Sequence, residues 1–265
     1  MRDGVAARAL QGIIPATRHV ETFPRQTRVP CTAVRRAPAA DAEQLDQLLF
    51  GEVYEVLDET AGWAFGQAAR DGYVGYVDAS MLGASPIAPT HTVRALRSYG
   101  YAAPSIKSAP TGLYSMNALL TETGRDGRFV NTAAGWFVAD HLAPVEDVET
   151  DLVSVALRFV GTPYHWGGRE SLGLDCSGLV QQSFYACGRL CPRDSDQQAA
   201  LGEAIDLPRR GDLAFWPGHV AIFTGPDEIV HASGHHMAVV VEPLAEATAR
   251  IARQGSGAPP FFRRP

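Results

Sequence analysis

The chain has 265 residues, of which 46% are hydrophobic and 20% are charged, and its net charge is −6. This composition is typical of a globular chain of two or three small domains, and it excludes a disordered chain, a coiled coil and a collagen-like repeat. No run approaches the roughly 18 apolar residues of a membrane span, and the acidic balance gives no reason to expect a nucleic-acid partner.

The first residues lack the apolar run of a secretory signal. They read MRDGVAAR, and no apolar stretch of about 7–15 residues follows. We therefore expect the protein to stay in the cytoplasm. Up to about residue 28 the sequence has no regular period, so residues 1–28 are predicted to form an irregular N-terminal arm.

Two segments of short predicted strands follow the arm. Residues 75–82 read GYVDASML and residues 135–142 read GWFVADHL, so the pattern recurs after 60 positions. Several short strands with a period near 60 residues favour two small β-barrels in tandem. The predicted barrels cover residues 29–86 and 88–146, and prolines between them stiffen the linker.

Beyond Pro144 the predicted helices come first and the predicted strands second, which is typical of an α+β domain. This domain is predicted to cover residues 150–265. Its expected helices cover residues 152–160, 176–187, a short segment from Ser195, and 244–253. Its expected strands cover residues 212–216, 219–224, 228–232 and 237–242.

One of the four cysteines is placed for nucleophilic chemistry. Cys176 is expected at the first turn of a helix, where unpaired N–H groups and the helix dipole favour a thiolate. The same N–H groups are candidate donors to an oxyanion. A buried structural cysteine is the alternative interpretation.

Two histidines supply a possible base and its partner. His219 begins one predicted strand and His231 lies in the next. Adjacent antiparallel strands bring the two imidazoles together if the register pairs them. Nucleophile, base and orienting group are the elements of a catalytic triad, although each histidine alone is more often structural.

These residues carry a resemblance to the NlpC family of papain-like cysteine peptidases. The motifs are TPYxWGG from residue 162, DCSG from residue 175, HVAI from residue 219 and VHA from residue 230, in the family's order. The resemblance covers about residues 150–245. The upstream segments resemble, through glycine and aromatic spacing, the bacterial SH3-like barrels of one subgroup. The implied fold is two all-β SH3-like barrels followed by an α+β papain-like domain.

The resemblance also implies roles for individual residues. Cys176 would be the nucleophile, His219 the general base and His231 the orienting residue. The other implied roles are oxyanion support by Tyr164, binding of a free amino terminus by Asp175, and binding of a D-glutamyl carboxylate by Ser177 and Ser195. Asp175 and Ser195 also fit the alternative interpretation of simple helix caps.

In the three-domain subgroup the first barrel covers the cleft and limits substrates to peptides with a free N-terminal L-Ala. Glu52 and Tyr73 best match the contacts of that barrel here. The alternatives are a solvated strand residue for Glu52 and a core residue for Tyr73. His235 and His236 have no counterpart in the motif.

The resemblance implies hydrolysis of the γ-D-glutamyl–diamino acid bond in peptidoglycan stem peptides. With a cytoplasmic location, it favours recycling of small muropeptides over remodelling of the intact wall. A small muropeptide is the expected partner. We expect no cofactor, no metal, no membrane and no protein partner.

Three alternatives stay open. The first is a zinc site formed by soft ligands near the C-terminal half of the chain, namely Cys187, Cys191, His231, His235 and His236. The second is a wall-binding protein without activity. The third is another acyl transfer on the same fold, such as an N-acetylmuramoyl-L-alanine amidase.

Overall fold

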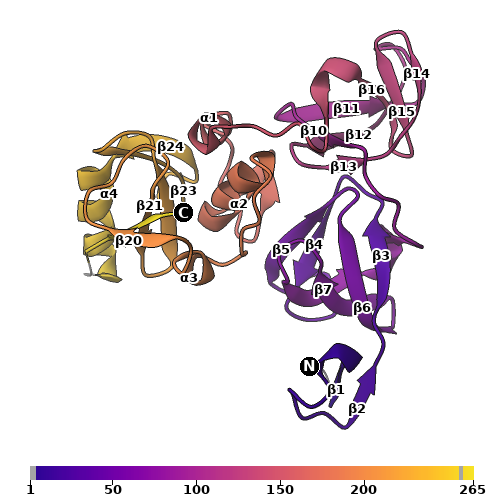
Figure 1. Ribbon diagram of the computed structural model, residues 1–265, viewed down its shortest axis with the longest axis horizontal. Helices are drawn as coiled ribbons and strands as arrows, with labels where there is room; N and C mark the ends of the chain where they lie inside the picture. The colour runs from indigo at the N-terminus through magenta and orange to yellow at the C-terminus, as the bar shows by residue number, and fades with distance from the viewer. Residues whose placement is uncertain (1–3, 257–258) are drawn as a thin grey trace.

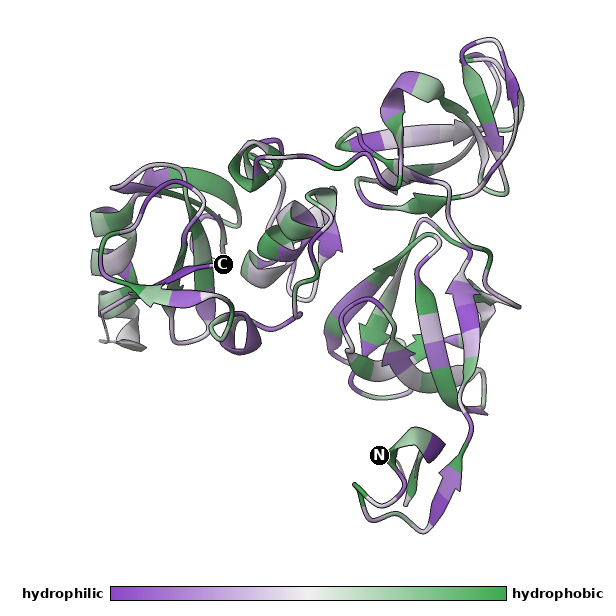
Figure 2. Ribbon diagram, in the orientation of Figure 1, coloured by the Kyte–Doolittle hydropathy of each residue, from purple (hydrophilic) through white to green (hydrophobic). Residues whose placement is uncertain are grey.

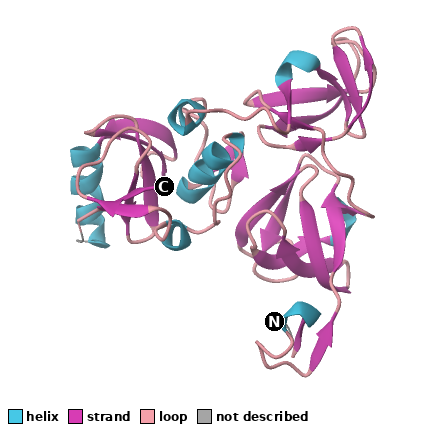
Figure 3. Ribbon diagram, in the orientation of Figure 1, coloured by secondary structure: helices cyan, strands magenta, loops and turns pink. Residues whose placement is uncertain are grey.

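The computed structural model describes residues 4–256 and 259–265. Residues 1–3 of the predicted arm and residues 257 and 258 of the predicted last domain lie outside the described residues. Over these residues the chain forms an N-terminal segment, two β-domains and a C-terminal domain that contains the four α-helices described (Figures 1 and 3). Among the described residues, no helix combines the length and apolar character that a membrane crossing requires.

The N-terminal segment is shorter than expected. Strand β1 (Val5–Ala7) pairs in parallel with β2 (Arg18–Val20). Strand β3 (Phe23–Thr27) already belongs to the first β-domain, because it pairs with strands at residues 53–56 and 82–83. The predicted end of the arm at residue 28 is therefore too late in the chain.

The first β-domain is a single bent sheet with the strand order β5-β4-β8-β7-β6-β3-β9. Its core holds Val34, Leu48, Tyr54 and Val56. Buried positions alternate with more exposed ones along Cys31–Arg35 and the first half of Val53–Thr60. Hydrophilic and hydrophobic residues are accordingly interspersed in this domain (Figure 2). Besides β3, its strands are β4 (Cys31–Arg35), β5 (Gln44–Leu49), β6 (Val53–Thr60), β7 (Trp63–Ala68), β8 (Val74–Asp78) and β9 (Leu82–Gly83).

The second β-domain resembles the end of the first, but its strands form two sheets, one of three and one of five strands. The 3-10 helix Ala79–Met81 follows β8, and the 3-10 helix Ala139–His141 follows β16 at an offset of 60 residues. The 60-residue offset is therefore present at this end of the two domains, and the interpretation as two SH3-like barrels stays a prediction. The strands are β10 (His91–Val93), β11 (Arg97–Tyr101), β12 (Pro110–Ser115), β13 (Leu119–Leu120), β14 (Glu122–Asp126), β15 (Phe129–Thr132), β16 (Gly135–Val138) and β17 (Leu142–Pro144).

The C-terminal domain places a sheet between helices. Helix α2 covers one face of the sheet, where Val180 of the helix and Val220 of the sheet belong to the same core cluster. Helix α4 covers the other face, where Ala247 of the helix and Ile229 of the sheet belong to a second cluster. The helices are α1 (Leu152–Leu157), α2 (Cys176–Ala186), α3 (Ser195–Gln198) and α4 (Leu244–Ile251), which leads into a π-helical turn at Ala252–Ser256.

The main sheet of this domain has the order β20-β25-β21-β22-β23-β24. Its four predicted strands are present, but the sequence analysis missed the two that complete it. The strands are β20 (Glu203–Ile205), β21 (Leu213–Trp216), β22 (His219–Phe223), β23 (Glu228–Ser233), β24 (Ala238–Pro243) and β25 (Phe261–Arg264), and a separate hairpin joins β18 (Arg169–Glu170) to β19 (Gly173–Leu174).

Candidate active site

Cys176 lies at the first position of α2, as the sequence predicts. Asp175 caps the helix, because its Oδ1 accepts a hydrogen bond from the Gly178 amide at 2.8 Å. Gly178 fits here because it lacks a side chain: a Cβ would lie 2.2 Å from the carbonyl oxygen of Gly168. The cap and this close packing hold the Cys176 thiol in a fixed place.

The surroundings of Cys176 favour the protonated thiol in the resting protein. Burial raises the pKa of Cys176 to about 12, and the Asp175 carboxylate acts in the same direction. The amide of Val220 acts in the opposite direction. The predicted preference for a thiolate at the helix start is therefore wrong for the resting state, because burial outweighs the N–H groups. The thiolate must form as a base removes the proton.

The thiol lies at the start of β22. The Val220 amide donates toward the sulfur of Cys176, and Val220 directly follows His219 in the chain. Cys176 and Gly218 also line the same cavity. Cys176 and the first residues of β22 are therefore neighbours.

The sheet brings His219 and His231 together. Ile222 of β22 lies opposite Val230 of β23, and this register places His219 diagonally across from His231 on one face of the sheet. Nε2 of His219 lies 2.6 Å from Nδ1 of His231, and the ring centroids are 4.9 Å apart. The expected meeting of the two imidazoles is therefore confirmed, while their catalytic roles stay predictions.

Glu242 and Arg250, which the sequence analysis missed, extend the His219–His231 pair into a row of hydrogen-bonded side chains. Oε1 of Glu242 lies 2.6 Å from Nε2 of His231, and Arg250 on α4 donates to both carboxylate oxygens. Strand alternation could have identified Glu242: it lies opposite Ile229, which shares a face with His231.

Burial keeps both imidazoles neutral. It lowers the pKa of His219 to about 3 and the pKa of His231 to about 4, although the hydrogen bond to Glu242 opposes the second shift. Burial acts to raise the pKa of Glu242, but hydrogen bonds from Arg250 and His231 outweigh it and hold that pKa below its usual value. Near neutral pH, a neutral imidazole pair therefore faces a carboxylate, which is the protonation state that a general base needs.

Cys176 opens into a cavity of about 270 Å³ between the C-terminal domain and the first β-domain. Tyr164 lines this cavity and also a second cavity of about 360 Å³, which reaches His219 and His231. Burial raises the pKa of Tyr164, so its hydroxyl keeps its proton and can donate to an oxyanion. The position fits the predicted oxyanion support.

The predicted substrate-binding residues Tyr73, Asp175, Ser177 and Ser195 all line the 270 Å³ cavity. Asp175 is already engaged, because Arg193 donates to its two oxygens at 3.0 and 2.6 Å. Arg193 also donates to Oγ of Ser177 at 2.7 Å. Asp175 and Ser177 therefore build the wall of the cavity, and their contacts with a substrate stay predictions.

Glu52 does not line the cavity, and its predicted role in the cleft requires correction. Its side chain is 1% exposed and accepts from Arg70 at 2.8 Å and from Arg169 at 2.6 Å. The contact with Arg169 joins the two domains. Glu52 belongs to a set that we call the interdomain ion cluster: Arg70, Arg169, Arg193, Asp46, Glu52, Asp71 and Asp175.

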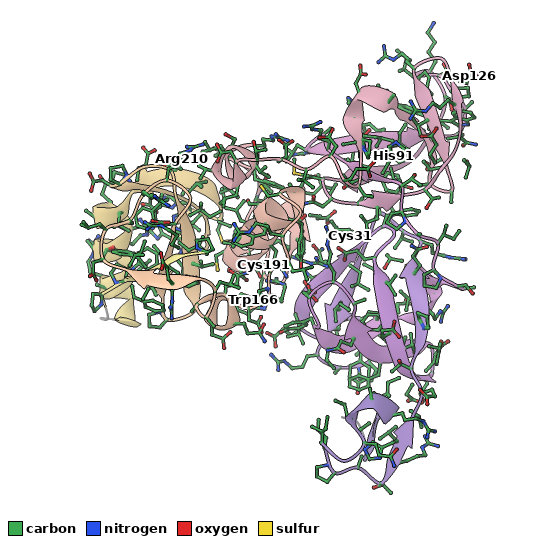
Figure 4. All side chains as sticks on the ribbon, in the orientation of Figure 1. Cys31, His91, Asp126, Trp166, Cys191 and Arg210 are labelled. Carbon is green, nitrogen blue, oxygen red and sulfur yellow. The ribbon has the colours of Figure 1, made fainter. Side chains whose placement is uncertain are left out.

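Glu43 is the carboxylate that the first β-domain presents to the cavity, and the sequence analysis missed it. Its side chain is 42% exposed. It accepts from Nε of Arg36 at 2.6 Å and from Nε1 of Trp166 at 3.2 Å. Figure 4 shows Trp166 on the side of the C-terminal domain that faces this β-domain. Glu43 lies in a loop before β5, where no motif or strand period marks it.

His235 and His236, which have no counterpart in the family motif, lie beside this row. His235 lines the 360 Å³ cavity. Within the described part of the chain, His231, His236 and Glu242 bring potential ligand atoms within 4.8 Å of one another, and neither Cys187 nor Cys191 belongs to this group. Because Arg250 occupies both Glu242 oxygens and His231 bonds to Glu242, we interpret the group as a hydrogen-bonded row.

Comparisons with known proteins agree with this geometry. Residues 161–251 match the model of the NlpC/P60 family. Residues 34–82 match the model described as the bacterial dipeptidyl-peptidase SH3 domain. The match to the SH3-domain model covers the first β-domain only.

Characterised relatives extend the likeness to most of the chain. "Dipeptidyl-peptidase 6" from Lysinibacillus sphaericus is 27% identical over 225 residues, which cover 74% of this chain and 82% of that protein. "Gamma-D-glutamyl-L-lysine dipeptidyl-peptidase" from Bacillus subtilis is 29% identical and covers 76% of each chain.

A solved structure shares the fold. The crystal structure of an NlpC/P60 family protein from Bacillus cereus superposes with a TM-score of 0.77 at 21% identity, covering 91% of this chain and 99% of that chain. The C-terminal domain, which carries Cys176 at a helix start and the His219–His231 pair, is a cysteine peptidase domain of the NlpC/P60 family.

Proposed function

We propose that the protein is a dipeptidyl-peptidase that cuts the γ-D-glutamyl–diamino acid bond of small peptidoglycan stem peptides with a free N-terminal L-Ala. Cys176 attacks the γ-carbonyl carbon, and its proton passes to His219 and then to the leaving amine. Water hydrolyses the resulting thioester and releases L-Ala-D-Glu.

The cavity beside Cys176, which the first β-domain walls on one side, is the observation that carries this proposal. The first β-domain contributes one wall through Arg36, Glu43, Leu45 and Tyr73. This wall stands beside Cys176 on one side of the cavity, which supports a substrate whose acyl side is short. The partly exposed Glu43 carboxylate suits an ammonium group, which is what a free amino terminus offers.

The names of the relatives support the same reaction class. Two of them are named for dipeptidyl-peptidase activity, and one of these names specifies a γ-D-glutamyl-L-lysine bond. A dipeptidyl-peptidase for short peptides fits recycling of fragments released from the wall. A cytoplasmic location belongs to this proposal, and fractionation of cells that produce the protein tests it separately.

The requirement for a free amine can be tested with pairs of peptides. L-Ala-γ-D-Glu-L-Lys and its diaminopimelate counterpart are each supplied with a free and with an acetylated amino terminus. We expect kcat/KM to fall about 10- to 100-fold on acetylation, the value of one hydrogen bond to a charged group. Glu43→Gln should lower kcat/KM for the free peptide and leave the acetylated peptide nearly unchanged.

Glu59→Gln is the matched control. Glu59 is also a partly exposed carboxylate of the first β-domain paired with an arginine, Arg25, but it lies outside the residues that line the cavity. Equal cleavage of free and acetylated peptides would refute the amine requirement. Release of intact stem peptides from muramoyl peptides would favour an amidase, and no cleavage at all would favour a wall-binding protein.

A further inference from the structure

We propose that Glu242 is a positioning residue that acts on Cys176 through the two histidines. Glu242, braced by Arg250, fixes the proton positions in the imidazole pair. The pair then presents an unprotonated nitrogen to the thiol. The proposal concerns the Cys–His chemistry of the site and does not depend on the substrate proposed above.

The hydrogen bonds determine which nitrogen carries each proton. An ionised carboxylate only accepts, so the contact of 2.6 Å between Glu242 and His231 requires a proton on Nε2 of His231. Nδ1 of His231 then carries only a lone pair, and its 2.6 Å contact with His219 requires a proton on Nε2 of His219. The remaining nitrogen of His219, Nδ1, is therefore the one that can accept a proton.

The sheet and α4 hold this row in place. His219, His231 and Glu242 come from the neighbouring strands β22, β23 and β24, and Arg250 reaches the row from α4. Glu242 is only 9% exposed, and its charge is balanced by an Arg250 bond of 2.6 Å. The charged or titratable groups that face the His231–Glu242 pair are His219, His236 and Arg250.

Glu242 and Arg250 act on the base in opposite directions. Burial and His231 lower the pKa of His219. Arg250 lowers it further, whereas Glu242 raises it. When the proton passes from Sγ of Cys176 to Nδ1 of His219, an imidazolium and a thiolate form together. Glu242 stabilises that imidazolium and Arg250 opposes it, so removing each one should have opposite effects.

The test uses Glu242→Gln, Arg250→Met and the control Glu228→Gln in the full chain. Glu228 is a carboxylate at the exposed end of β23, bonded to Thr224. For each protein, the alkylation rate of Cys176 by iodoacetamide is followed against pH by peptide mass spectrometry. Peptide cleavage gives kcat and KM, and thermal unfolding checks the fold.

We expect Glu242→Gln to slow alkylation near neutral pH and to lower kcat about 100-fold with little change in KM, the lower range for a positioned base. The acid limb of the alkylation profile should move to lower pH in Glu242→Gln and to higher pH in Arg250→Met. Glu228→Gln should match the unsubstituted protein.

Two results would overturn the proposal. One is a folded Glu242→Gln protein that alkylates at the rate of the control. The other is a shift of the acid limb in the same direction, or in neither direction, for the two variants. If Glu242→Gln does not fold, Arg250→Met decides alone: an unchanged profile or a shift to lower pH refutes the role. If the unsubstituted protein alkylates but cuts none of the peptides, the proposed substrate fails while the alkylation data still decide on Glu242.

Discussion

Asp175 has two effects on Cys176, the nucleophile of the proposed reaction. As the cap of α2, it fixes the start of the helix and therefore the place of the thiol. Its charge raises the pKa of Cys176, whereas Arg193 lowers it. The pairing of Asp175 with Arg193 therefore keeps the geometry of the helix start while it limits the electrostatic penalty on a thiolate.

Replacing Asp175 with Asn should separate these two effects. Asn keeps a capping oxygen but carries no charge, so the pKa of Cys176 should fall and more thiolate should exist at any pH below it. We expect faster alkylation of Cys176 by iodoacetamide than in the unsubstituted protein, measured at one mildly alkaline pH on the peptide that contains Cys176.

The control is Asp151→Asn at the cap of α1. Asp151 accepts from the Val153 amide at 3.0 Å, as Asp175 does from its own helix, but it is not among the groups that shift the pKa of Cys176. Its variant should alkylate at the unsubstituted rate. Unchanged or slower alkylation in Asp175→Asn, with α2 intact, would contradict this account.

The sequence predicts residues with a local signal and misses those defined by distant contacts. Cys176, His219 and His231 each stand in a short motif or at a strand start. Glu43 has no such signal, because its importance comes from a cavity between two domains. Glu52 was misplaced for the same reason: nothing local shows that a strand-end carboxylate is buried against Arg169.

At the scale of elements, the alternation of side chains along the strands determines which residues of the site lie on the same face of the sheet. His219, His231 and Glu242 share one face of three neighbouring strands, and the register places them in a diagonal row. Strand boundaries were predicted within a residue or two for β21 to β24. The same alternation, applied to the fourth of these strands, would have added Glu242 to the predicted site.

Elements held by long-range contacts were not predictable. β25 contains two phenylalanines followed by two arginines and has no strand period, yet it pairs between β20 and β21. Phe261 stacks on Phe215 at 5.4 Å, and Arg264 pairs with Asp212 at 2.9 Å. Helix α1 ends at Leu157 rather than near residue 160, and the chain continues as a turn in which Phe159 is buried and Val160 is 49% exposed.

For the whole molecule, the interdomain ion cluster joins the first β-domain to the wall of the active-site cavity. Arg193 reaches Asp46 at 2.7 Å and Asp175 at 2.6 Å, so one guanidinium links the first β-domain to the residue that precedes Cys176. Three guanidinium groups face four carboxylates in this cluster. Burial raises the pKa of Asp46 to about 7, so a retained proton there balances the charges.

Two isosteric substitutions should therefore lower the free energy of unfolding by different amounts. Glu52→Gln removes a charge that two buried arginines need, and we expect it to lower the free energy of unfolding by about 3 kcal/mol or more. Asp46→Asn replaces a group that already holds a proton part of the time, so it should cost less than about 1 kcal/mol near neutral pH. Denaturant unfolding of the full chain measures both.

The pH dependence has a defined sign. Because the pKa of Asp46 is raised from 3.8 to about 7, the folded state keeps this proton longer than the unfolded state does. The stability that this residue contributes is present below its unfolded value and falls as pH rises through about 7. Asp46→Asn should therefore gain stability relative to the unsubstituted protein as pH rises. Equal costs for the two variants at every pH would be inconsistent with a protonated Asp46.

The most direct measurement determines which bond of the peptide is cut and whether Cys176 is required for the cut. The peptide L-Ala-γ-D-Glu-L-Lys is incubated with the protein and with Cys176→Ala, in water enriched in the heavy oxygen isotope, and the products are weighed by mass spectrometry. We predict L-Ala-D-Glu with one heavy oxygen in its γ-carboxylate, free lysine, and no product from Cys176→Ala. Release of free L-Ala, or equal turnover by a folded Cys176→Ala protein, would contradict the account.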